Sequence, residues 1–300
     1  MPKLYLATCA ALPHLAPDDR PLVTALEALG LEPEVVVWDD PDVDWSTARL
    51  CVIRTVWDYH LKREAFLAWA GRLAETSRLL NPLALVRWNT EKSYLRTFEA
   101  RGLPVVPTLW VGQGERLDLA AAIAERGWDE FVVKPVISAS AYGTIRASRD
   151  DMPRAQDHLE TLTASRGVMI QPYLRSVEGP GERSLVFIEG AYTHTARKVP
   201  VLAAEAADPD AVELITPDED ELALAQTVIA SLDEPPLYAR VDLIRGEAGM
   251  PMIMELELVE PSLFLDRAPE ATARFAEAIA RHWEAADRQP VGANHGVEPL

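Results

Sequence analysis

The chain is short of positive charge, of cysteine and of long apolar runs, and each shortage excludes a class of protein. Against 47 acidic residues stand only 29 Lys and Arg, and the net charge of −18 argues against nucleic acid or an anionic membrane as the main partner. No stretch reaches membrane-spanning length, and the N-terminus lacks the basic region and apolar run of a signal peptide. The two cysteines, Cys9 and Cys51, have no metal-ligand spacing and are interpreted as small buried hydrophobes. We therefore expect a protein of the reducing cytoplasm.

Two common nucleotide-binding motifs are also missing. No Walker A sequence occurs, which excludes a P-loop, and the first predicted strand–helix turn has no Gly-x-Gly-x-x-Gly, which counts against a dinucleotide site. The six histidines have no metal-like spacing, and no Ser or Cys is convincingly placed as a nucleophile. With 300 residues that are 48% apolar, the chain can still bury a sizeable core in two or three modest domains.

The first 88 or so residues alternate between strand and helix patterns. We expect strands at 3–8, 34–38 and 50–53 and helices at 18–29 and 63–74, which predicts a small, largely parallel sheet. Ligands bind at the carboxyl ends of such strands, and the polar and aromatic segment 54–60 directly follows the third one. It is a candidate docking site for a small molecule. The alternative is a loop in which Trp57 and Tyr59 pack on the next helix.

A predicted hairpin near the C-terminal end organises the rest of the chain. Its arms, 238–244 and 251–259, alternate between polar and apolar residues, so side chains two apart share a face. A four-residue loop at 247–250 places Asp242 opposite Glu255 and Arg240 opposite Glu257. The other face is then apolar and is expected to point into a core; it comprises Val241, Leu243, Met254, Leu256 and Leu258.

The polar face of this hairpin carries three carboxylates, from Asp242, Glu255 and Glu257. At an effective dielectric of ~20, two charges ~5 Å apart repel by about 3 kcal/mol, so something positive is expected between them. Oxygen ligands on rigid strands suit Mg²⁺, which usually also holds substrate phosphates. The alternative is a cross-strand ion pair between Arg240 and Glu257 beside a solvated sheet face.

The middle of the chain supplies candidate phosphate ligands. Lys134 ends a predicted strand at 131–135, and the loop of small residues that follows, 138–143, lets backbone N–H groups approach an anion. By itself such a loop is more often a flexible turn. A helix is expected at 89–101 with Thr90 as its N-cap. The hairpin of 184–188 and 191–199, with its turn at Glu189-Gly190, places Glu182 opposite Arg197, with Lys198 on the other face.

The order of these pieces resembles the ATP-grasp ligases. The resemblance rests on the Asn/Lys-led helix, Val-Val-Lys-Pro, the small-residue loop, Gln-Pro-Tyr-Leu, Arg-x-Asp and Glu-x-Glu, and it covers about residues 81–266. It implies an α/β fold with an α+β C-terminal part, in which a Rossmann-like domain precedes the ATP-grasp fold. The implied division is an N-terminal domain at 1–88, a central subdomain with a lid loop at 89–175, a C-terminal subdomain with the Mg²⁺ site at 176–287, and a loose tail at 288–300.

The resemblance also implies roles for individual residues. Lys92 and Lys134 would hold the α- and β-phosphates under a lid with Ser138, Ser140 and Gly143. The linker beside adenine would be Gln171, Tyr173 and Leu174, with Glu178 on the ribose. Lys198 and Arg240 would face the γ-phosphate or acyl group, and Asp242, Glu255 and Glu257 would carry one or two Mg²⁺ ions, or Mn²⁺. Two departures stand out: Glu257 replaces the Asn of many members, and the lid is not glycine-rich.

The segments 53–60 and 255–262 look most like a smaller branch of the family. That branch includes the ligase that closes O-ureido-D-serine to the antibiotic D-cycloserine. The implied function is ATP-dependent carboxylate–amine ligation through an acyl phosphate, and the expected substrate contacts are Arg54, Thr55, Tyr59 and Ser262. Other expectations remain open: an ATP-grasp ligase for another substrate, resembling the D-Ala-D-Ala or glutamate ligases, a small-molecule kinase, or a nucleotide-binding protein without turnover. A homodimer is compatible with the sequence but not required by it.

Overall fold

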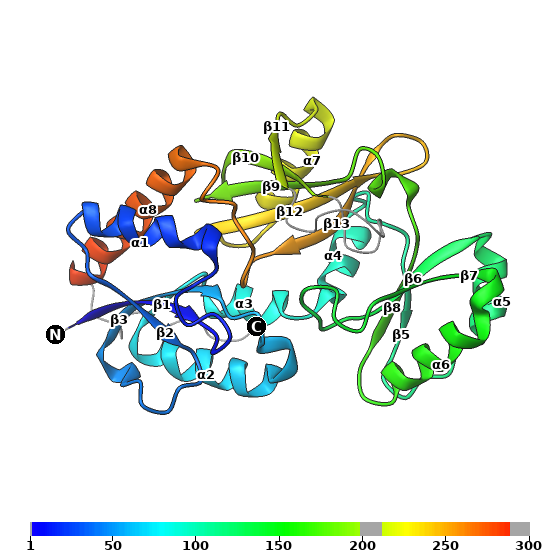
Figure 1. The fold of residues 1–300 in the computed structure, drawn as a ribbon, viewed down its shortest axis with the longest axis horizontal. Helices are drawn as coiled ribbons and strands as arrows, with labels where there is room; N and C mark the ends of the chain where they lie inside the picture. The colour runs from blue at the N-terminus through cyan, green and yellow to red at the C-terminus, as the bar shows by residue number, and fades with distance from the viewer. Residues whose placement is uncertain (1, 199–211, 289–300) are drawn as a thin grey trace.

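The computed structural model describes residues 2–198 and 212–288, which fold around three sheets (Figure 1). The helices are α1 (Arg20–Ala28), α2 (Arg63–Thr76), α3 (Leu83–Asn89), α4 (Leu95–Ala100), α5 (Leu119–Arg126), α6 (Met152–Thr163), α7 (Glu219–Ala230) and α8 (Pro269–Arg288). None of them is long and apolar enough to cross a membrane. The predicted tail lies outside the described residues, except for Arg288 at the end of α8.

The N-terminal sheet is parallel and has the strand order β2-β1-β3-β4, as the alternating pattern predicted. Its strands are β1 (Lys3–Thr8), β2 (Pro33–Val37), β3 (Ala48–Thr55) and β4 (Arg78–Leu80). Gly30, which follows α1, has a φ of +79°, so the chain can reverse there into β2 without the strain a side chain would bring. Strand β3 continues to Thr55, two residues beyond the predicted end, and thereby brings the 54–60 segment to the edge of the sheet.

The largest sheet is antiparallel and has the order β11-β10-β9-β12-β13. Its strands are β9 (Glu182–Ile188), β10 (Ala191–Lys198), β11 (Val212–Ile215), β12 (Tyr238–Arg245) and β13 (Pro251–Glu257). The predicted pairs Arg240–Glu257 and Asp242–Glu255 both occur. Beyond them a bulge pairs Leu243 with Ile253, and the prediction that Met254 points into the core is therefore wrong.

A second bulge corrects the predicted register of the β9–β10 hairpin. It lies between Tyr192 and His194 and shifts the strand by one residue, so Glu182 lies opposite Lys198, and Arg197 faces Arg183 instead. The shift joins Lys198 and Glu182 in an ion pair of 2.8 Å. Val199, predicted to end this strand, lies outside the described residues.

The third sheet has the order β5-β8-β6-β7 and is covered by α5 and α6 (Figure 1). Its strands are β5 (Leu109–Val111), β6 (Glu130–Pro135), β7 (Ile145–Ser148) and β8 (Val168–Pro172). The helix expected at 89–101 begins later than predicted: Asn89 is the last residue of α3, and α4 begins only at Leu95. Thr90 follows α3 and donates to the carbonyl of Arg87, so it is not an N-cap.

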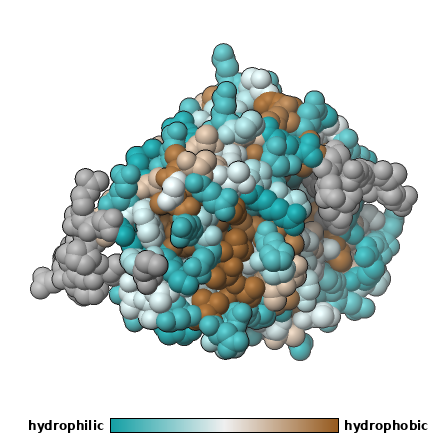
Figure 2. All heavy atoms as spheres, turned by 60° about the vertical axis from the view of Figure 1, so that its left-hand side comes forward, coloured by the Kyte–Doolittle hydropathy of each residue, from teal (hydrophilic) through white to brown (hydrophobic). Residues whose placement is uncertain are grey.

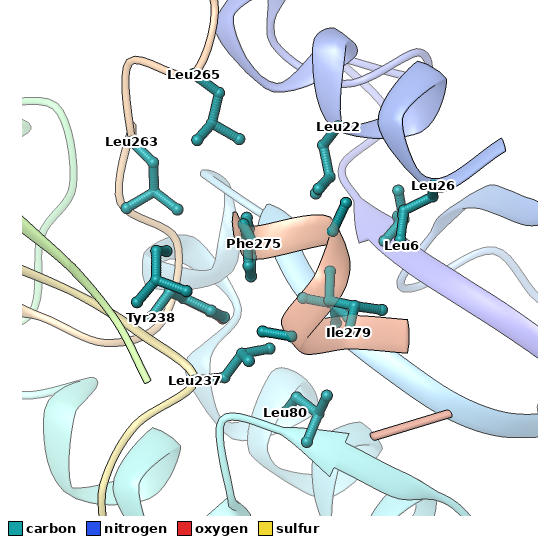
Figure 3. Close-up of a cluster of buried hydrophobic side chains, with 14 of the residues drawn as sticks. Leu6, Leu22, Leu26, Leu80, Leu237, Tyr238, Leu263, Leu265, Phe275 and Ile279 are labelled. Carbon is teal, nitrogen blue, oxygen red and sulfur yellow. The ribbon is translucent and has the colours of Figure 1, made fainter. Parts of the chain in front are cut away.

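Helix α8, near the C-terminus, packs against elements of the N-terminal part of the chain. It packs against α1, β3 and β9, and its Phe275 and Ile279 are fully buried beside Leu22, Leu80 and Tyr238 (Figure 3). The N-terminal sheet and the largest sheet thus share one apolar core. Seen from the N-terminal side, the surface is mostly hydrophilic, with a strip of apolar residues across it (Figure 2).

Candidate active site

A cavity of about 490 Å³ lies where the three sheets meet. This volume is in the usual range for a small-molecule site. The largest sheet contributes one wall through β12 and β13, the third sheet contributes another through β6 and β8, and the 54–60 segment closes one end with Trp57 and Tyr59. The loop after β6 reaches over the cavity with Ser138, Ser140 and their alanine neighbours.

Charged side chains from six parts of the chain line this cavity. The cations are Lys92, Lys134, Lys198 and Arg240, and the carboxylates are Glu182, Asp242, Glu255, Glu257 and Glu260. Most of them pair with one another: Arg240 with Asp242 and Glu257, Lys92 with Glu255, and Lys198 with Glu182. Within residues 2–198 and 212–288, only Lys134 and Glu260 of this set have no ion pair.

Arg240 is the centre of the polar face of the hairpin. Its Nε and Nη2 atoms each lie 2.8 Å from an oxygen of Asp242, and it also donates to the carboxylate of Glu257. Ser184 donates to Asp242 from β9 at 2.7 Å. Burial would raise the pKa of Asp242, but Arg240 and Lys198 lower it to about 2. Burial and the Asp242 charge raise the pKa of Glu257 to about 7, against the opposing effect of Arg240.

Lys92 connects the hairpin to the lid loop. Its ammonium pairs with Glu255 and donates to the carbonyl of Ser138 at 2.9 Å, while its backbone N–H donates to Val136. Burial lowers the pKa of Lys134, the neighbouring cation that has no such pair. An unpaired, half-buried cation at the end of a strand is the electrostatic complement of a phosphate.

The three hairpin carboxylates fit Mg²⁺ by their donor chemistry. They offer only oxygen atoms, and Mg²⁺ characteristically takes one or two carboxylates together with phosphate oxygens and water. Among the described residues no three His, Cys, Asp or Glu side chains form a ready metal cage. The cross-strand ion pair between Arg240 and Glu257, the alternative to a metal site, is present, and Asp242 is buried rather than solvated.

One part of the cavity wall is an apolar slot. It is lined by Val106, Val132, Leu174, Val177, Ile244 and Met254. The bulge in β13 turns Met254 into this slot, which suits the flat ring of a nucleobase. Gln171 and Tyr173 lie at its rim. Glu178 does not line the cavity; it bonds to Tyr173 and Arg146.

Fewer residues of the lid loop line the cavity than expected. Ser138 and Ser140 line the cavity, but Gly143 lies behind it, with its carbonyl 2.8 Å from Nε2 of His158. Ser140 has a φ of +48°, a conformation that L residues seldom adopt. Tyr142 contacts His60, with ring centroids 5.1 Å apart, so the lid touches the N-terminal part of the chain.

Two of the four expected substrate contacts lie behind the cavity wall. Arg54 is fully buried and pairs with Asp19 at 2.8 Å, and Thr55 bonds to Thr8, so both support the wall instead of meeting a ligand. Tyr59 and Ser262 do line the cavity. Sequence reasoning missed Asn89 and Glu260. Their signals are weak, since Asn89 ends a helix and Glu260 simply continues the acidic run of β13.

Three comparisons bear on this geometry. Residues 4–81 match the family model described as D-cycloserine synthetase DcsG, N-terminal domain. The cycloserine biosynthesis protein DcsG of Streptomyces lavendulae is 36% identical over 293 residues, which cover 92% of this chain and 97% of that protein. The crystal structure of D-cycloserine synthetase DcsG superposes with a TM-score of 0.86 at 36% identity, covering 93% of this chain and 99% of that one.

More distant structures share the fold alone. A D-alanine–D-alanine ligase from Bacillus anthracis, solved with ATP, has a TM-score of 0.66 at 13% identity and covers 96% of this chain and 99% of its own. A RimK-domain ATP-grasp protein from Sphaerobacter thermophilus has a TM-score of 0.65 at 18% identity and covers 92% and 98%. The expected fold and enzyme class are confirmed: the chain belongs to the DcsG family of ATP-grasp ligases, enzymes that join a carboxylate to an amine with ATP.

Proposed function

We propose that this protein closes O-ureido-D-serine to D-cycloserine with conversion of ATP to ADP and phosphate. The observation that carries the proposal is the 36% identity to DcsG across nearly the whole of both chains. The cavity supports it, because its wall combines an apolar slot, a group of cations and the polar side chains of Tyr59 and Ser262. That combination suits a nucleobase, a triphosphate and a small carboxylate.

The cations of the cavity are proposed to bind the phosphates. Lys134 is free to pair with one, and Lys92 lies beside it beneath the lid, where the carbonyl of Ser138 fixes the ammonium. Gln171, Tyr173 and Leu174 would border the adenine. Ser140 would lie over the phosphates, and Gly143 would let the lid bend around them. Arg240 and Lys198 would offset charge on the group transferred from ATP, since both lie on strands of the same sheet with fixed partners.

Asp242, Glu255 and Glu257 are proposed to hold one or two Mg²⁺ ions, or Mn²⁺. Bound there, the metal would neutralise phosphate charge and orient the γ-phosphate. The chain itself prepares these groups for that role: Ser184 and Arg240 fix Asp242, and Asn89 fixes the strand that carries both glutamates.

The proposed reaction has three steps, the last of which consumes a water molecule. The substrate carboxylate attacks the γ-phosphorus, forming an acyl phosphate and releasing ADP. The aminooxy nitrogen then attacks the carbonyl, phosphate leaves with one former carboxylate oxygen, and the nitrogen gives up its proton. Hydrolysis of the carbamoyl group, which leaves as carbamate, yields D-cycloserine. Holding both groups in one cavity can supply several kcal/mol of the barrier.

The cellular setting proposed is the cytoplasm, where ATP is at hand and the free thiols of Cys9 and Cys51 stay reduced. The partner is then a small amino-acid derivative. The homodimer that the sequence allows stays a prediction.

The test supplies O-ureido-D-serine with ATP and Mg²⁺ and measures ADP and D-cycloserine together. We expect equal amounts of both, and a hydroxamate when hydroxylamine is added to trap the acyl phosphate. Asp242→Asn should abolish both products without loss of the fold by circular dichroism. Release of ADP with D-alanine or L-glutamate, but not with O-ureido-D-serine, would assign the enzyme to another substrate. A stable phosphorylated product would make it a kinase.

A further inference from the structure

The loop after β13 is held by an unbroken series of side-chain hydrogen bonds. Each of the six carbonyl oxygens from 258 to 263 has a side-chain donor within 3.1 Å. In chain order the donors are Asn81, Tyr238, Trp57, Arg54, Arg240 and His194. Three of them, Arg54, Trp57 and Asn81, come from the N-terminal part of the chain. A loop fixed at every peptide presents its side chains in one orientation, as a binding site requires.

Two polar side chains of this loop line the cavity, and only one of them is satisfied. Ser262 bonds to Asp18. Glu260 lines the same cavity, and among the described residues its carboxylate has neither a hydrogen bond nor an ion pair. Its own backbone carbonyl, by contrast, accepts from Trp57 at 3.0 Å. The other four carboxylates of the cavity each have a cationic partner.

A half-buried carboxylate without a partner costs free energy, so its retention on a rigid loop indicates that a ligand supplies the partner. Burial, together with the charge of Glu257, raises the pKa of Glu260 to about 8. A cation placed beside it would restore the ionised form. Lys92 and Arg240 are close enough to affect its titration, but both are already paired elsewhere.

We propose that Glu260 binds the α-ammonium group of the amino-acid substrate and thereby selects substrates that carry one. The inference rests on the proposed function, because it takes the substrate to be an amino-acid derivative. Glu260 lies on the same rigid loop as Ser262, beside Trp57 and Tyr59. An ammonium held there leaves the substrate carboxylate free to face Arg240 and the phosphates.

The same carboxylate is poorly suited to the metal. Asp242, Glu255 and Glu257 lie on two paired strands, whereas Glu260 lies beyond the end of β13, in the loop. A substrate without the amino group would leave Glu260 half-buried and unpaired. Sites built to pair with a polar group reject the analogue that lacks it. Glu260 is therefore a specificity residue for the ammonium rather than a metal ligand.

The experiment compares the purified enzyme with Glu260→Gln, using Glu270→Gln as the matched control. Glu270 is an exposed residue in the first turn of α8 and does not line the cavity. Each protein is assayed for ADP release with O-ureido-D-serine and with 3-(ureidooxy)propanoate, the same molecule without its amino group. The KM for ATP and the Mg²⁺ concentration for half-maximal rate are measured in parallel.

We expect Glu260→Gln to raise the KM for O-ureido-D-serine at least tenfold and to remove most of the preference for it over the desamino compound. The KM for ATP and the Mg²⁺ requirement should stay within about twofold, and Glu270→Gln should match the parent enzyme. An unchanged preference for the aminated substrate would overturn the proposal, as would a large rise in the Mg²⁺ requirement. If the parent enzyme instead accepts D-alanine, the proposed substrate fails, and D-alanine against propionate then tests Glu260 in the same way.

Discussion

Among the described residues, Lys134 and Glu260 are the two ionisable groups without an ion pair in a cavity whose other ionisable groups are all paired. Each lowers the stability of the ligand-free protein, because each is partly removed from water and has no ion pair to compensate. Each also determines which ligand group the cavity can pair with. Lys134, at the end of β6, suits an anionic group of a ligand, and Glu260, in the loop after β13, suits a cationic one. At the scale of residues, binding and stability therefore oppose each other at these two positions.

The effect of Lys134 can be measured by removing its charge. Lys134→Met keeps the apolar stem and breaks no ion pair, so the free energy of unfolding should stay the same or rise. The KM for ATP should rise about 10- to 100-fold, the equivalent of losing a charge-assisted hydrogen bond. Lys3→Met, which removes an exposed ammonium paired with Glu34, serves as the control. An unchanged affinity for ATP would remove Lys134 from the nucleotide site.

Glu260 predicts a pH dependence of stability. Its pKa is about 8 in the folded protein against an ordinary value of 4.5, so the folded state binds its proton more tightly than the unfolded state. Stability then falls as the pH rises from about 4.5 to about 8. We expect Glu260→Gln to flatten this part of the curve in thermal unfolding without ATP. A curve as steep in the variant as in the parent protein would show that other groups produce the slope.

At the scale of elements, regular alternation in the sequence predicts strand pairing well. It does not predict a β-bulge, in which one strand carries one extra residue. Strict alternation in 238–244 and 251–257 was enough to place Asp242 opposite Glu255, because one face must be buried. The two bulges were not predictable, since a bulge depends on packing with strands distant in the chain. They matter for the site, because one turns Met254 into the apolar slot and the other pairs Lys198 with Glu182.

The outer edge of β13 shows how a helix end can replace a neighbouring strand. Asn89 donates to the carbonyl of Leu256 and accepts from the N–H of Leu258, both at 2.7 Å, as a paired strand would. Tyr94 accepts from the N–H of Leu256 at 2.9 Å. These side chains satisfy an edge that would otherwise lie buried and unpaired, and they fix the glutamates on either side of Leu256.

Asn89→Ala should therefore weaken both stability and catalysis. It leaves one buried carbonyl and one buried N–H without partners, for which we expect a loss of about 1–3 kcal/mol each in the free energy of unfolding. The turnover number should also fall at least tenfold, since Glu255 and Glu257 lose their fixed positions. Urea denaturation and steady-state kinetics measure the two effects. Glu99→Ala, on the exposed face of α4, is the control, and a variant as stable as this control would contradict the role assigned to Asn89.

At the scale of the whole molecule, the N-terminal sheet serves the active site as a support. Arg54 is buried between Asp19 and the loop after β13, and its guanidinium lies 4.9 Å from the ring centroid of Tyr238. It donates to the carbonyl of Pro261, a residue 207 positions away in the chain. The sequence predicted Arg54 in the segment directly after a strand, whereas β3 continues through it to Thr55. The sequence could not show that the partner would be a distant carbonyl instead of the substrate.

This support can be separated from binding by two variants. Arg54→Met leaves the carboxylate of Asp19 buried without its partner, and removing one member of such a pair costs about 3–5 kcal/mol in the free energy of unfolding. Because burial already raises the pKa of Asp19 to about 6, against the opposing charge of Arg54, neutralising it should be tolerated once the arginine is gone. The double variant Arg54→Met/Asp19→Asn should therefore recover much of the lost stability in urea denaturation. Both variants should still raise the KM for the amino-acid substrate more than the KM for ATP. The reason is that each lacks the hydrogen bond from Arg54 to the carbonyl of Pro261, which fixes the loop next to Glu260. Equal rises in the two constants would mean that the N-terminal sheet stabilises the cavity as a whole and does not specifically position the loop that carries Glu260.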